Sequence, residues 1–319
     1  MIVTLDAYLA DLRVLVDEAL ARALPDDRAP TLIVEAMRYS LAAGGKRLRP
    51  VLALAAADAV AEKAGTPVRD ARMLALPAAV ALEFVHTYSL IHDDLPAMDD
   101  DTLRRGRPTS HVVFGDGLAV LAGDGLLTEA FAILAERESR LLPPGAPRTD
   151  DARRLDALAV IARGAGAIGM VGGQAIDLHA AGKTPDALRV PRTLDAASLR
   201  DMHLRKTGAL MQASVVAGGI MAGADDAALR ALDAYGDGIG LAFQIVDDVL
   251  DVEGTADALG KTAGKDAAAG KPTYPALYGI AESRRMAQAA VDDAVAALTR
   301  GGLSGRLPDL ARHILDRTS

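Results

Sequence analysis

Residues 226–251, with the sequence DAALRALDAYGDGIGLAFQIVDDVLD, form the stretch that decides the fold class. Alanine and leucine recur through it, and these residues favour helices, whereas strands favour β-branched and aromatic side chains. The whole chain shares this character, because only 3% of its residues are aromatic and tryptophan is absent. Asp-Gly pairs at 116–117, 124–125 and 237–238 lie in Ala/Leu-rich stretches and not between alternating runs, which argues against hairpins. The composition therefore predicts an all-α protein.

Helical periodicity recurs from one end of the chain to the other. An amphipathic first helix is defined by Leu5, Leu9, Leu12 and Val16. Further long helices are expected at 49–64, 71–94, 115–140, 152–166, 195–221, 226–251 and 274–299. Clusters of Pro or Gly mark loops at 24–30, 65–70, 143–151, 182–193 and 300–308. None of these loops resembles a long flexible linker, so the sequence predicts one domain over residues 1–319, a helical bundle around a central cavity.

The composition also restricts the classes of function. With 50% hydrophobic and 24% charged residues among 319, the chain is too apolar to be disordered. Its formal net charge of −8 gives no general affinity for nucleic acid or an anionic membrane. The absence of cysteine excludes disulfides, zinc-thiolate sites and cysteine nucleophiles. No basic stretch precedes an apolar run at the N-terminus and no uninterrupted apolar run reaches ~18 residues, so we expect a cytoplasmic protein without a signal peptide or an integral membrane segment.

One acidic motif lies in the helical stretch FQIVDDVLD at 243–251. Asp247 and Asp251 are four residues apart and so share one face of a helix, with Asp248 beside them. Two carboxylates stacked in this way repel each other unless a cation lies between them. Mg²⁺ suits such a pair, because it commonly takes one or two carboxylates and fills its other positions with phosphate and water.

A second acidic motif, Asp93, Asp94 and Asp99, lies in HDDLPAMDDD. Asp93 and Asp99 are six residues apart, which an ideal helix would place ~120° apart around its axis. Pro96 resolves this conflict, because it removes an intrahelical hydrogen bond and clashes with the carbonyl of His92. We therefore predict that the helix bulges or ends here and lets Asp99 swing back towards Asp93.

Aspartate triplets alone are weak evidence in a chain so rich in aspartate. Asp150, Asp151 and Asp156 spell another DDxxxxD, and we interpret them as solvated surface charge. The other two motifs differ because basic clusters accompany them: Lys46, Arg47 and Arg49; Arg104 and Arg105; Lys206 with Thr207; and Lys261, Lys265 and Lys271. Carboxylates for a metal beside separate basic clusters indicate diphosphate binding, since arginine grips phosphate oxygens bidentately.

Six ordered motifs resemble the trans-isoprenyl diphosphate synthases, and among them the bacterial farnesyl diphosphate synthase type. The motifs are GGKRLRP (44–50), HTYSLIHDDLPAMDDDTLRRGRPTSH (86–111), GMVGGQAIDL (169–178), HLRKTGAL (203–210), FQIVDDVLD (243–251) and GKTAGKDAAAGKPTYP (260–275). The resemblance covers nearly the whole chain. It implies the isoprenoid-synthase helical bundle with an active site in its central cavity, usually as a homodimer, with prenyl diphosphates as substrates and Mg²⁺, three ions per active site, as cofactor.

The resemblance also implies roles for single residues. Metal ligands would be Asp93, Asp99 and Asp247, with Asp94, Asp248 and Asp251 in or near that shell. The allylic diphosphate would be held by Arg104, Lys206, Thr207, Gln244, Lys261 and Lys271. Isopentenyl diphosphate would be held by Lys46, Arg49, His86 and Arg105. Of these, Asp93, Asp99, Arg104, Lys206, Asp247 and Lys261 would carry the catalysis.

The reaction implied is a head-to-tail condensation in which the allylic C–O bond ionises and the double bond of isopentenyl diphosphate attacks the cation. Product length would depend on Tyr88 and Ser89, five and four residues before Asp93, because this pattern resembles enzymes that stop at fifteen carbons. An ideal helical wheel, however, puts Ser89 beneath Asp93 and Tyr88 to the side. Geranyl and geranylgeranyl diphosphate synthases therefore stay alternatives, as do, less favoured, a class I terpene cyclase and a non-catalytic prenyl-diphosphate-binding subunit.

Several residues have plainer interpretations. His86 and Asp93 share a helix face, which favours a substrate contact for His86, whereas His92 and His111 are expected to be structural. Arg47 is interpreted as a solvated neighbour of Lys46 and Arg49. In a separate motif, we expect a hydrogen bond within the cavity wall between Gln174 and Asp177.

Overall fold

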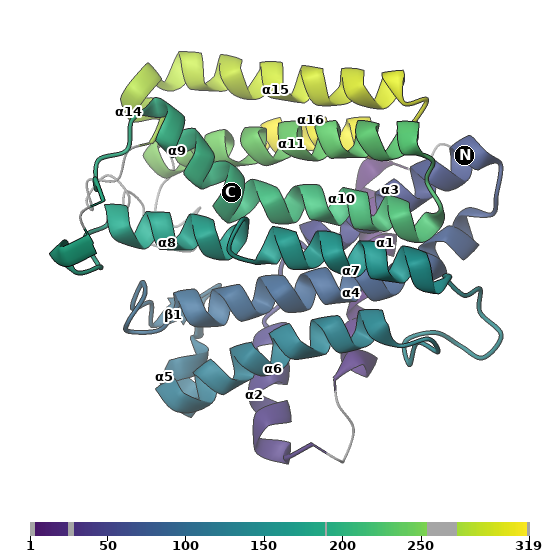
Figure 1. Cartoon of the computed structure of the whole chain (residues 1–319), viewed down its shortest axis with the longest axis horizontal. Helices are drawn as coiled ribbons and strands as arrows, with labels where there is room; N and C mark the ends of the chain where they lie inside the picture. The colour runs from purple at the N-terminus through teal and green to yellow at the C-terminus, as the bar shows by residue number, and fades with distance from the viewer. Residues whose placement is uncertain (1–3, 25–28, 189, 254–272, 318–319) are drawn as a thin grey trace. The chain divides into compact units, whose positions relative to one another are not determined.

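The structure is a computed structural model that describes residues 4–24, 29–188, 190–253 and 273–317. The chain forms two compact units, Met1–Val160 with Ser214–Asp225 and Ile161–Ala213 with Asp226–Ser319, called unit 1 and unit 2. In the described residues nearly all regular structure is helical, and the only strands are two residues long, so the all-α prediction is confirmed (Figure 1). The prediction of one domain over residues 1–319 stays a prediction.

Unit 1 is built on two helices with long buried stretches. Its elements are α1 (Leu5–Ala23), α2 (Thr31–Leu41), α3 (Leu48–Ala64), α4 (Val68–Asp93), β1 (Leu103–Arg104), β2 (Arg107–Pro108), α5 (Ser110–Phe114), α6 (Asp116–Ala135), most of α7 (Asp151–Ala165) and most of α10 (Ala209–Ala222). Every residue from Pro50 to Ala61 in α3 and from Ala75 to Val85 in α4 is buried. A helix that is apolar on all sides must lie inside the protein, so these two helices form the core. Helix α6 runs beside α4 in the opposite direction (Figure 1).

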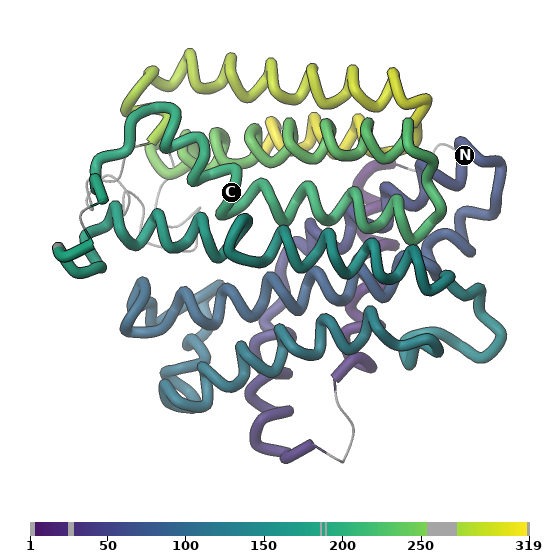
Figure 2. The backbone as a smooth tube through the Cα atoms, viewed as in Figure 1, coloured from purple at the N-terminus to yellow at the C-terminus, as the bar shows by residue number. Residues whose placement is uncertain are grey.

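Unit 2 is organised around α11 (Asp226–Glu253), the helix that carries Asp247, Asp248 and Asp251. Its elements are α8 (Met170–Ala180), η1 (Asp186–Leu188), α9 (Ala196–His203), the π-helical turn η2 (Leu204–Gly208), α11, α14 (Tyr274–Tyr278), α15 (Ile280–Arg300) and α16 (Leu307–Leu315), with the remainder of α7 and α10. Helix α15 runs back along α11 (Figure 2). Glycines permit the close packing of α11: a Cβ at Gly240 would lie 2.7 Å from the Cα of Gly208, and one at Gly238 would lie 2.8 Å from the carbonyl oxygen of Ala290.

The helix predictions fail at breaks and at short helices. The helix expected over 195–221 is interrupted by η2, and the one over 274–299 is broken at Gly279, whose φ of 78° only glycine adopts readily. Helices α2, α8 and α16 were not expected at all. Neither was the hairpin β1–β2, whose two turn residues, Arg105 and Gly106, both have positive φ, as a type I′ turn requires.

Three helical stretches of the described residues are long and apolar enough to cross a membrane by length and composition: Val68–Asp93, Asp116–Ala135 and Asp151–Ala180. Most of the first is buried inside the protein, and most of the other two is not. These three stretches contain scattered charged residues, so a search of the sequence for uninterrupted apolar runs does not find them. The absence of a membrane segment thus stays a prediction.

We predict that Gly218→Ala destabilises unit 1. Gly218 on α10 lies so close to α3 that an added Cβ would meet the backbone carbonyl of Ala53, and overpacking of this kind costs about 1–3 kcal/mol. Thermal unfolding followed by circular dichroism would measure the loss. Gly117→Ala is the control, because no atom lies within 4 Å of a Cβ there. Equal melting temperatures for the two variants would contradict the close approach.

Candidate active site

The first acidic motif lies where α4 ends. The helix stops at Asp93, the carbonyl of Leu90 still accepts from the amide of Asp94, and the chain then turns back through Pro96. The amide of Asp99 donates to the carbonyl oxygen of Asp93 at 2.8 Å. This confirms the prediction that the helix ends here and that Asp99 returns to Asp93.

Asp94 is held by the hairpin that follows. The guanidinium of Arg104 on β1 grips both oxygens of the Asp94 carboxylate, with Nη2–Oδ1 at 2.6 Å and Nε–Oδ2 at 3.0 Å. Burial opposes the charge of Arg104, but the carboxylate outweighs this and raises the pKa of the guanidinium. Burial likewise raises the pKa of Asp94, and Arg104 offsets only part of that shift. The pair therefore fixes the hairpin against the end of α4.

Arg47 corrects the sequence interpretation, because it is not a solvated neighbour of Lys46. Its side chain is only 6% exposed, and it donates to Asp17 and Glu83 at 2.8 Å each and to the carbonyls of Leu41 and Gly44. Burial works against its charge, but the two carboxylates raise the pKa of the guanidinium. Arg47 is thus a structural residue of the loop before α3.

Four arginines of the described part of the chain lie near His86. Burial, together with the positive charges of Arg49, Arg105, Arg104 and Arg47, lowers the pKa of His86 well below its ordinary value, so the imidazole is neutral at pH 7. Burial and the neighbouring guanidiniums lower the pKa of Arg105 as well. Neighbouring cations that lower one another's pKa in this way create a positive field that favours a bound anion. The structure thus brings together three residues assigned to isopentenyl diphosphate, namely Arg49, His86 and Arg105.

The turn before α3, at Gly44 and Gly45, lies against Arg105. The Arg105 guanidinium donates to the carbonyl of Gly44, and a Cβ at Gly45 would lie 2.5 Å from its Nη1 atom. Lys46 is exposed, and its carbonyl accepts from Arg13 at 3.3 Å. A small cavity of about 40 Å³ lies between α4 and the hairpin, with Glu83, Asp94, Arg104 and Arg105 in its wall. We call Lys46, Arg49, His86, Arg104 and Arg105 the basic cluster of unit 1.

The aromatic candidate for product length is buried beside the first acidic motif. Tyr88 packs edge-on against the His92 ring, with 5.7 Å between the centroids. Burial first, and the Asp93 carboxylate second, raise the pKa of Tyr88 to about 12. The hydroxyl of Ser89 donates to the carbonyl of His86 at 2.8 Å.

His92 and His111, the other histidines of the motif at 86–111, make contacts within the protein, in line with the structural role expected of them. The Nε2 atom of His92 lies 3.0 Å from the carbonyl oxygen of Val120, and Nδ1 of His111 lies 3.1 Å from the hydroxyl of Thr109.

The second acidic motif lies on α11, in unit 2. Asp247 is 40% exposed and pairs with Arg317 near the C-terminus, Nη1–Oδ1 3.0 Å, while the same guanidinium lies 4.1 Å from the Phe243 ring centroid. Asp248 is only 4% exposed and accepts from the Gln244 amide and from the backbone amide of Tyr274, both at 3.0 Å. Asp248 therefore anchors the start of α14.

Thr207 joins the network of Asp248. Its hydroxyl donates to Oε1 of Gln244 at 3.0 Å, so that Gln244 links Thr207 to Asp248. The structure thus brings together two of the residues predicted for the allylic diphosphate.

Lys206 lies on the π-helical turn η2, which packs against α8. Its Nζ donates to the buried carboxylate of Asp177 at 2.6 Å, and a Cβ at Gly173 would collide with the Lys206 backbone. The expected hydrogen bond between Gln174 and Asp177 is wrong: neither polar atom of the Gln174 amide has a partner among the described residues. Asp177 accepts a hydrogen bond from Lys206 instead.

Some predicted residues cannot be placed and some contacts were missed. Lys261, Lys265 and Lys271 lie outside the described residues. Sequence reasoning missed Glu83 and Arg317. A lone charge inside the apolar run ALEFV was a signal for Glu83, whereas nothing in the sequence near the C-terminus distinguished Arg317.

The donor set fits a magnesium ion that also binds substrate. Among the described residues, no three His, Cys, Asp or Glu side chains form a ready-made metal cage. The backbones of Asp93 and Asp99 are nevertheless joined by the turn after α4, and Mg²⁺ is usually bound through one or two carboxylates with substrate phosphates and waters completing its shell. Asp247 and Asp251 offer oxygen ligands of the same kind on α11.

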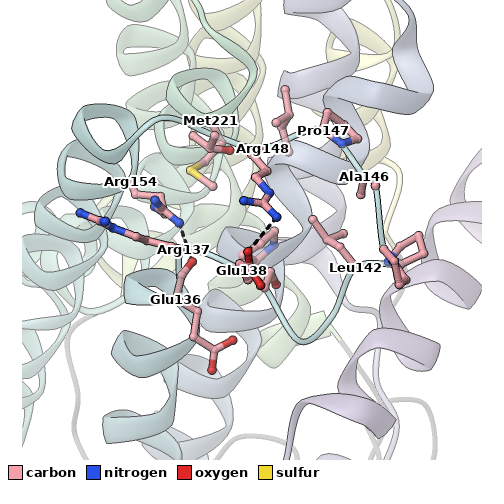
Figure 3. Close-up of a pocket in the computed structure, with 16 residues that line it drawn as sticks. Glu136, Arg137, Glu138, Leu142, Ala146, Pro147, Arg148, Arg154 and Met221 are labelled. Atoms are coloured by element: carbon pink, nitrogen blue, oxygen red, sulfur yellow. Dashed lines mark hydrogen bonds and ion pairs between the residues drawn. The ribbon is translucent and has the colours of Figure 1, made fainter.

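A cavity of about 400 Å³ in unit 1 is separate from this site. It lies under the loop after α6, near the N-terminal half of α4, with Pro77, Arg148, Arg154 and Met221 in its wall (Figure 3). None of the predicted site residues lines it.

The third aspartate triplet lies beside this loop and is surface charge, as expected. The Asp150 carboxylate accepts from the Arg153 amide at 2.9 Å, and Asp151 pairs with Arg137 at 2.8 Å.

Comparison with known proteins agrees with the resemblance. The family model described as "Polyprenyl synthetase" matches residues 30–300, which include parts of both units. The farnesyl diphosphate synthase of Escherichia coli (strain K12) is 47% identical over 272 residues, 85% of this chain and 82% of the relative. The geranylgeranyl diphosphate synthase of Cyanophora paradoxa is 42% identical over 287 residues, 90% and 87%.

A solved structure is similar over its whole length. The crystal structure of an FPP/GFPP synthase from Zymomonas mobilis matches with a TM-score of 0.78 at 38% identity, covering 99% of this chain and 98% of that one. The predicted isoprenoid-synthase helical fold is thereby confirmed.

We predict that the imidazole of His86 takes up its proton at a lower pH than an exposed histidine does in the unliganded protein, because its pKa is lowered. Burial and the arginines depress its pKa below the usual 6.5, so a proton that binds the unfolded chain does not bind the folded one. Added inorganic pyrophosphate brings negative charge to the cluster and should raise the pKa. An NMR titration of the histidines, with a His86→Gln variant for assignment, measures both. An ordinary pKa that pyrophosphate leaves unchanged would contradict the cluster.

We predict that Gly45→Ala weakens pyrophosphate binding by about 10-fold or more, because the new methyl group displaces the Arg105 guanidinium from a charge-assisted contact. Isothermal titration calorimetry measures the change. Gly44→Ala is the control: it imposes the same kind of backbone strain at a φ of 75°, but its Cβ has open space. If both variants bind equally, strain in the turn and not the position of Arg105 controls the affinity.

Proposed function

Because the chain belongs to the polyprenyl synthetase family and is a prenyltransferase, we propose that it is a Mg²⁺-dependent farnesyl diphosphate synthase. It condenses isopentenyl diphosphate with dimethylallyl diphosphate and then with geranyl diphosphate, and releases pyrophosphate. The observation that carries this proposal is the basic cluster of unit 1 around a neutral His86, on the helix α4 that ends at Asp93, where the backbone of Asp99 returns to Asp93. Anion binding and metal binding at adjoining places are what a diphosphate substrate needs.

The residues proposed to bind diphosphate divide between the two substrates. Lys46, Arg49, His86 and Arg105 bind isopentenyl diphosphate. Arg104, Lys206, Thr207 and Gln244 bind the allylic diphosphate, with Lys261 and Lys271. His86 is neutral and can donate a hydrogen bond to a phosphate oxygen, whereas the arginines supply the charge.

Asp93, Asp99 and Asp247, with Asp251, are the proposed metal ligands, and three Mg²⁺ ions would be bound. When bound, Mg²⁺ supplies Lewis-acid stabilisation of the leaving diphosphate. Asp94 and Asp248 have a different task here, since their carboxylates are occupied by Arg104 and by Gln244 with the Tyr274 amide. We assign them to holding neighbouring groups in place, near the metal shell and not in it.

The chain's own residues then carry the reaction. Arginine and lysine side chains bind the departing pyrophosphate, so that charge separation at the allylic C–O bond is stabilised. The buried alanine- and leucine-rich stretches of α3 and α4 would exclude the water that would quench an allylic cation. No described side chain is assigned as the base for the final proton loss, and the departed pyrophosphate takes that proton in this proposal.

Fifteen carbons is the proposed product length, because buried Tyr88 beside Asp93 limits the space for a growing chain. A geranylgeranyl diphosphate synthase is the second candidate, since the Cyanophora relative with that name is as extensively similar.

A homodimer is part of the proposal. Val112, Val113, Val120 and Leu121 on α5 and α6 are all at least 38% exposed, an apolar surface that a second copy would cover. We also propose that the protein is cytoplasmic, because its net charge of −8 gives no general affinity for an anionic membrane.

The proposal predicts pyrophosphate release that requires Mg²⁺ and both substrates. Asp93→Asn and Asp247→Asn should each lower the rate by at least about 100-fold, the scale on which lost transition-state stabilisation acts. Asp156→Asn, in the exposed third triplet, is the control and should leave the rate unchanged. A coupled pyrophosphate assay measures these rates. Release from an allylic diphosphate alone would indicate a terpene cyclase, and no release would indicate a binding subunit.

Tyr88→Ala should lengthen the product beyond fifteen carbons, because it removes a buried ring next to the first acidic motif. Chromatography of the dephosphorylated products gives the chain length. Tyr8→Ala removes another buried tyrosine of unit 1, one that is bound to Asp58, and should leave the length unchanged. Unaltered fifteen-carbon output from Tyr88→Ala would refute this role.

A further inference from the structure

We propose that Glu83 is a positioning residue for isopentenyl diphosphate: its buried carboxylate orients Arg47, and Arg47 holds the turn that presents Lys46 and Arg49 to the substrate. This inference rests on the proposed function and extends it to a residue that does not itself touch substrate. Glu83 lies on α4, three residues before His86, so it shares a helix face with that member of the basic cluster.

The burial of Glu83 requires an explanation. Its side chain is only 3% exposed, and glutamate is almost never so buried unless it is paired. Oε1 accepts from Nη1 of Arg47 at 2.8 Å, whereas Oε2 is buried and accepts no hydrogen bond from the described residues. A carboxylate with half its acceptors unsatisfied is a poor stabilising element. Its presence in the buried stretch of α4, paired with Arg47, therefore points to the placement of positive charge.

Arg47 carries the effect of Glu83 to the loop before α3. Residues 44, 45 and 47 all have positive φ, and Arg47 itself adopts 50°, which a non-glycine residue holds only when its surroundings enforce it. The guanidinium supplies that enforcement, because it binds the carbonyls of Leu41 and Gly44 and so closes the turn on itself. With Arg47 pointing inward, Lys46 is exposed on one side of it and Arg49 lies in the first turn of α3 on the other.

Glu83 also lies near Arg104 and Arg105, the basic residues of the hairpin β1–β2. It lines the same small cavity as Arg104 and Arg105, and its charge acts on Arg105 against the repulsion of Arg47 and Arg104. Arg105 in turn donates to Gly44, the residue whose carbonyl Arg47 also binds. One buried negative charge thus keeps the hairpin and the turn in place before any diphosphate arrives, which lowers the ordering cost of binding.

The test is calorimetric titration of isopentenyl diphosphate, without Mg²⁺ or allylic substrate, into Glu83→Gln. We expect the dissociation constant to rise at least tenfold. In turnover, KM for isopentenyl diphosphate should rise likewise, while kcat and KM for the allylic substrate stay within twofold. Arg47→Lys keeps the charge but loses the forked contacts, and it should show the same selective defect if Glu83→Gln fails to fold.

The matched control is Asp58→Asn. Asp58 is another buried carboxylate of unit 1, 4% exposed and paired with Arg72 and Tyr8, so its loss tests general destabilisation. It should lower the melting temperature yet bind isopentenyl diphosphate as the wild type does. Wild-type affinity in folded Glu83→Gln or Arg47→Lys would overturn the inference. A wild-type protein that binds no isopentenyl diphosphate would instead overturn the proposed function.

Discussion

The burial of α4 is the constraint on which the rest of unit 1 depends. Its middle, from Ala75 to Val85, is enclosed on all sides, so the helix cannot rotate without exposing apolar surface. The polar residues that follow, His86 and Asp93 among them, consequently have fixed directions. The end of the helix is equally determined, since the return of Asp99 to the Asp93 carbonyl closes the turn that leads to the hairpin.

Charge is distributed over this scaffold in two layers. Buried carboxylates, Glu83 and Asp94, hold arginines from neighbouring segments, while more exposed groups such as Lys46 remain accessible to solvent. Unit 2 repeats the arrangement, because Asp177 holds Lys206 and Asp248 holds Gln244. In both acidic motifs the second aspartate of the DD pair is buried and held by protein groups, and Asp247 in addition pairs with Arg317.

Sequence reasoning reached the fold class and the motifs but not the directions of individual side chains. Ala/Leu composition predicts helices, and Pro96 predicts the break after Asp93 because its steric effect is local. The inward turn of Arg47 depends on carboxylates 30 and 36 residues away, at Asp17 and Glu83, and no local pattern reveals it. The hairpin was missed because Arg-Gly is not the usual type I′ pair and the strands are two residues long.

Both acidic motifs, in this account, hold metal ions on a diphosphate substrate. Counting bound Mn²⁺ by electron paramagnetic resonance, with an unreactive allylic diphosphate analogue present, tests this most directly. The account predicts about three ions per chain in the wild type and fewer in Asp93→Asn and in Asp247→Asn, because each variant removes one of the carboxylates through which Mg²⁺ is usually bound. An unchanged count in either variant would contradict it.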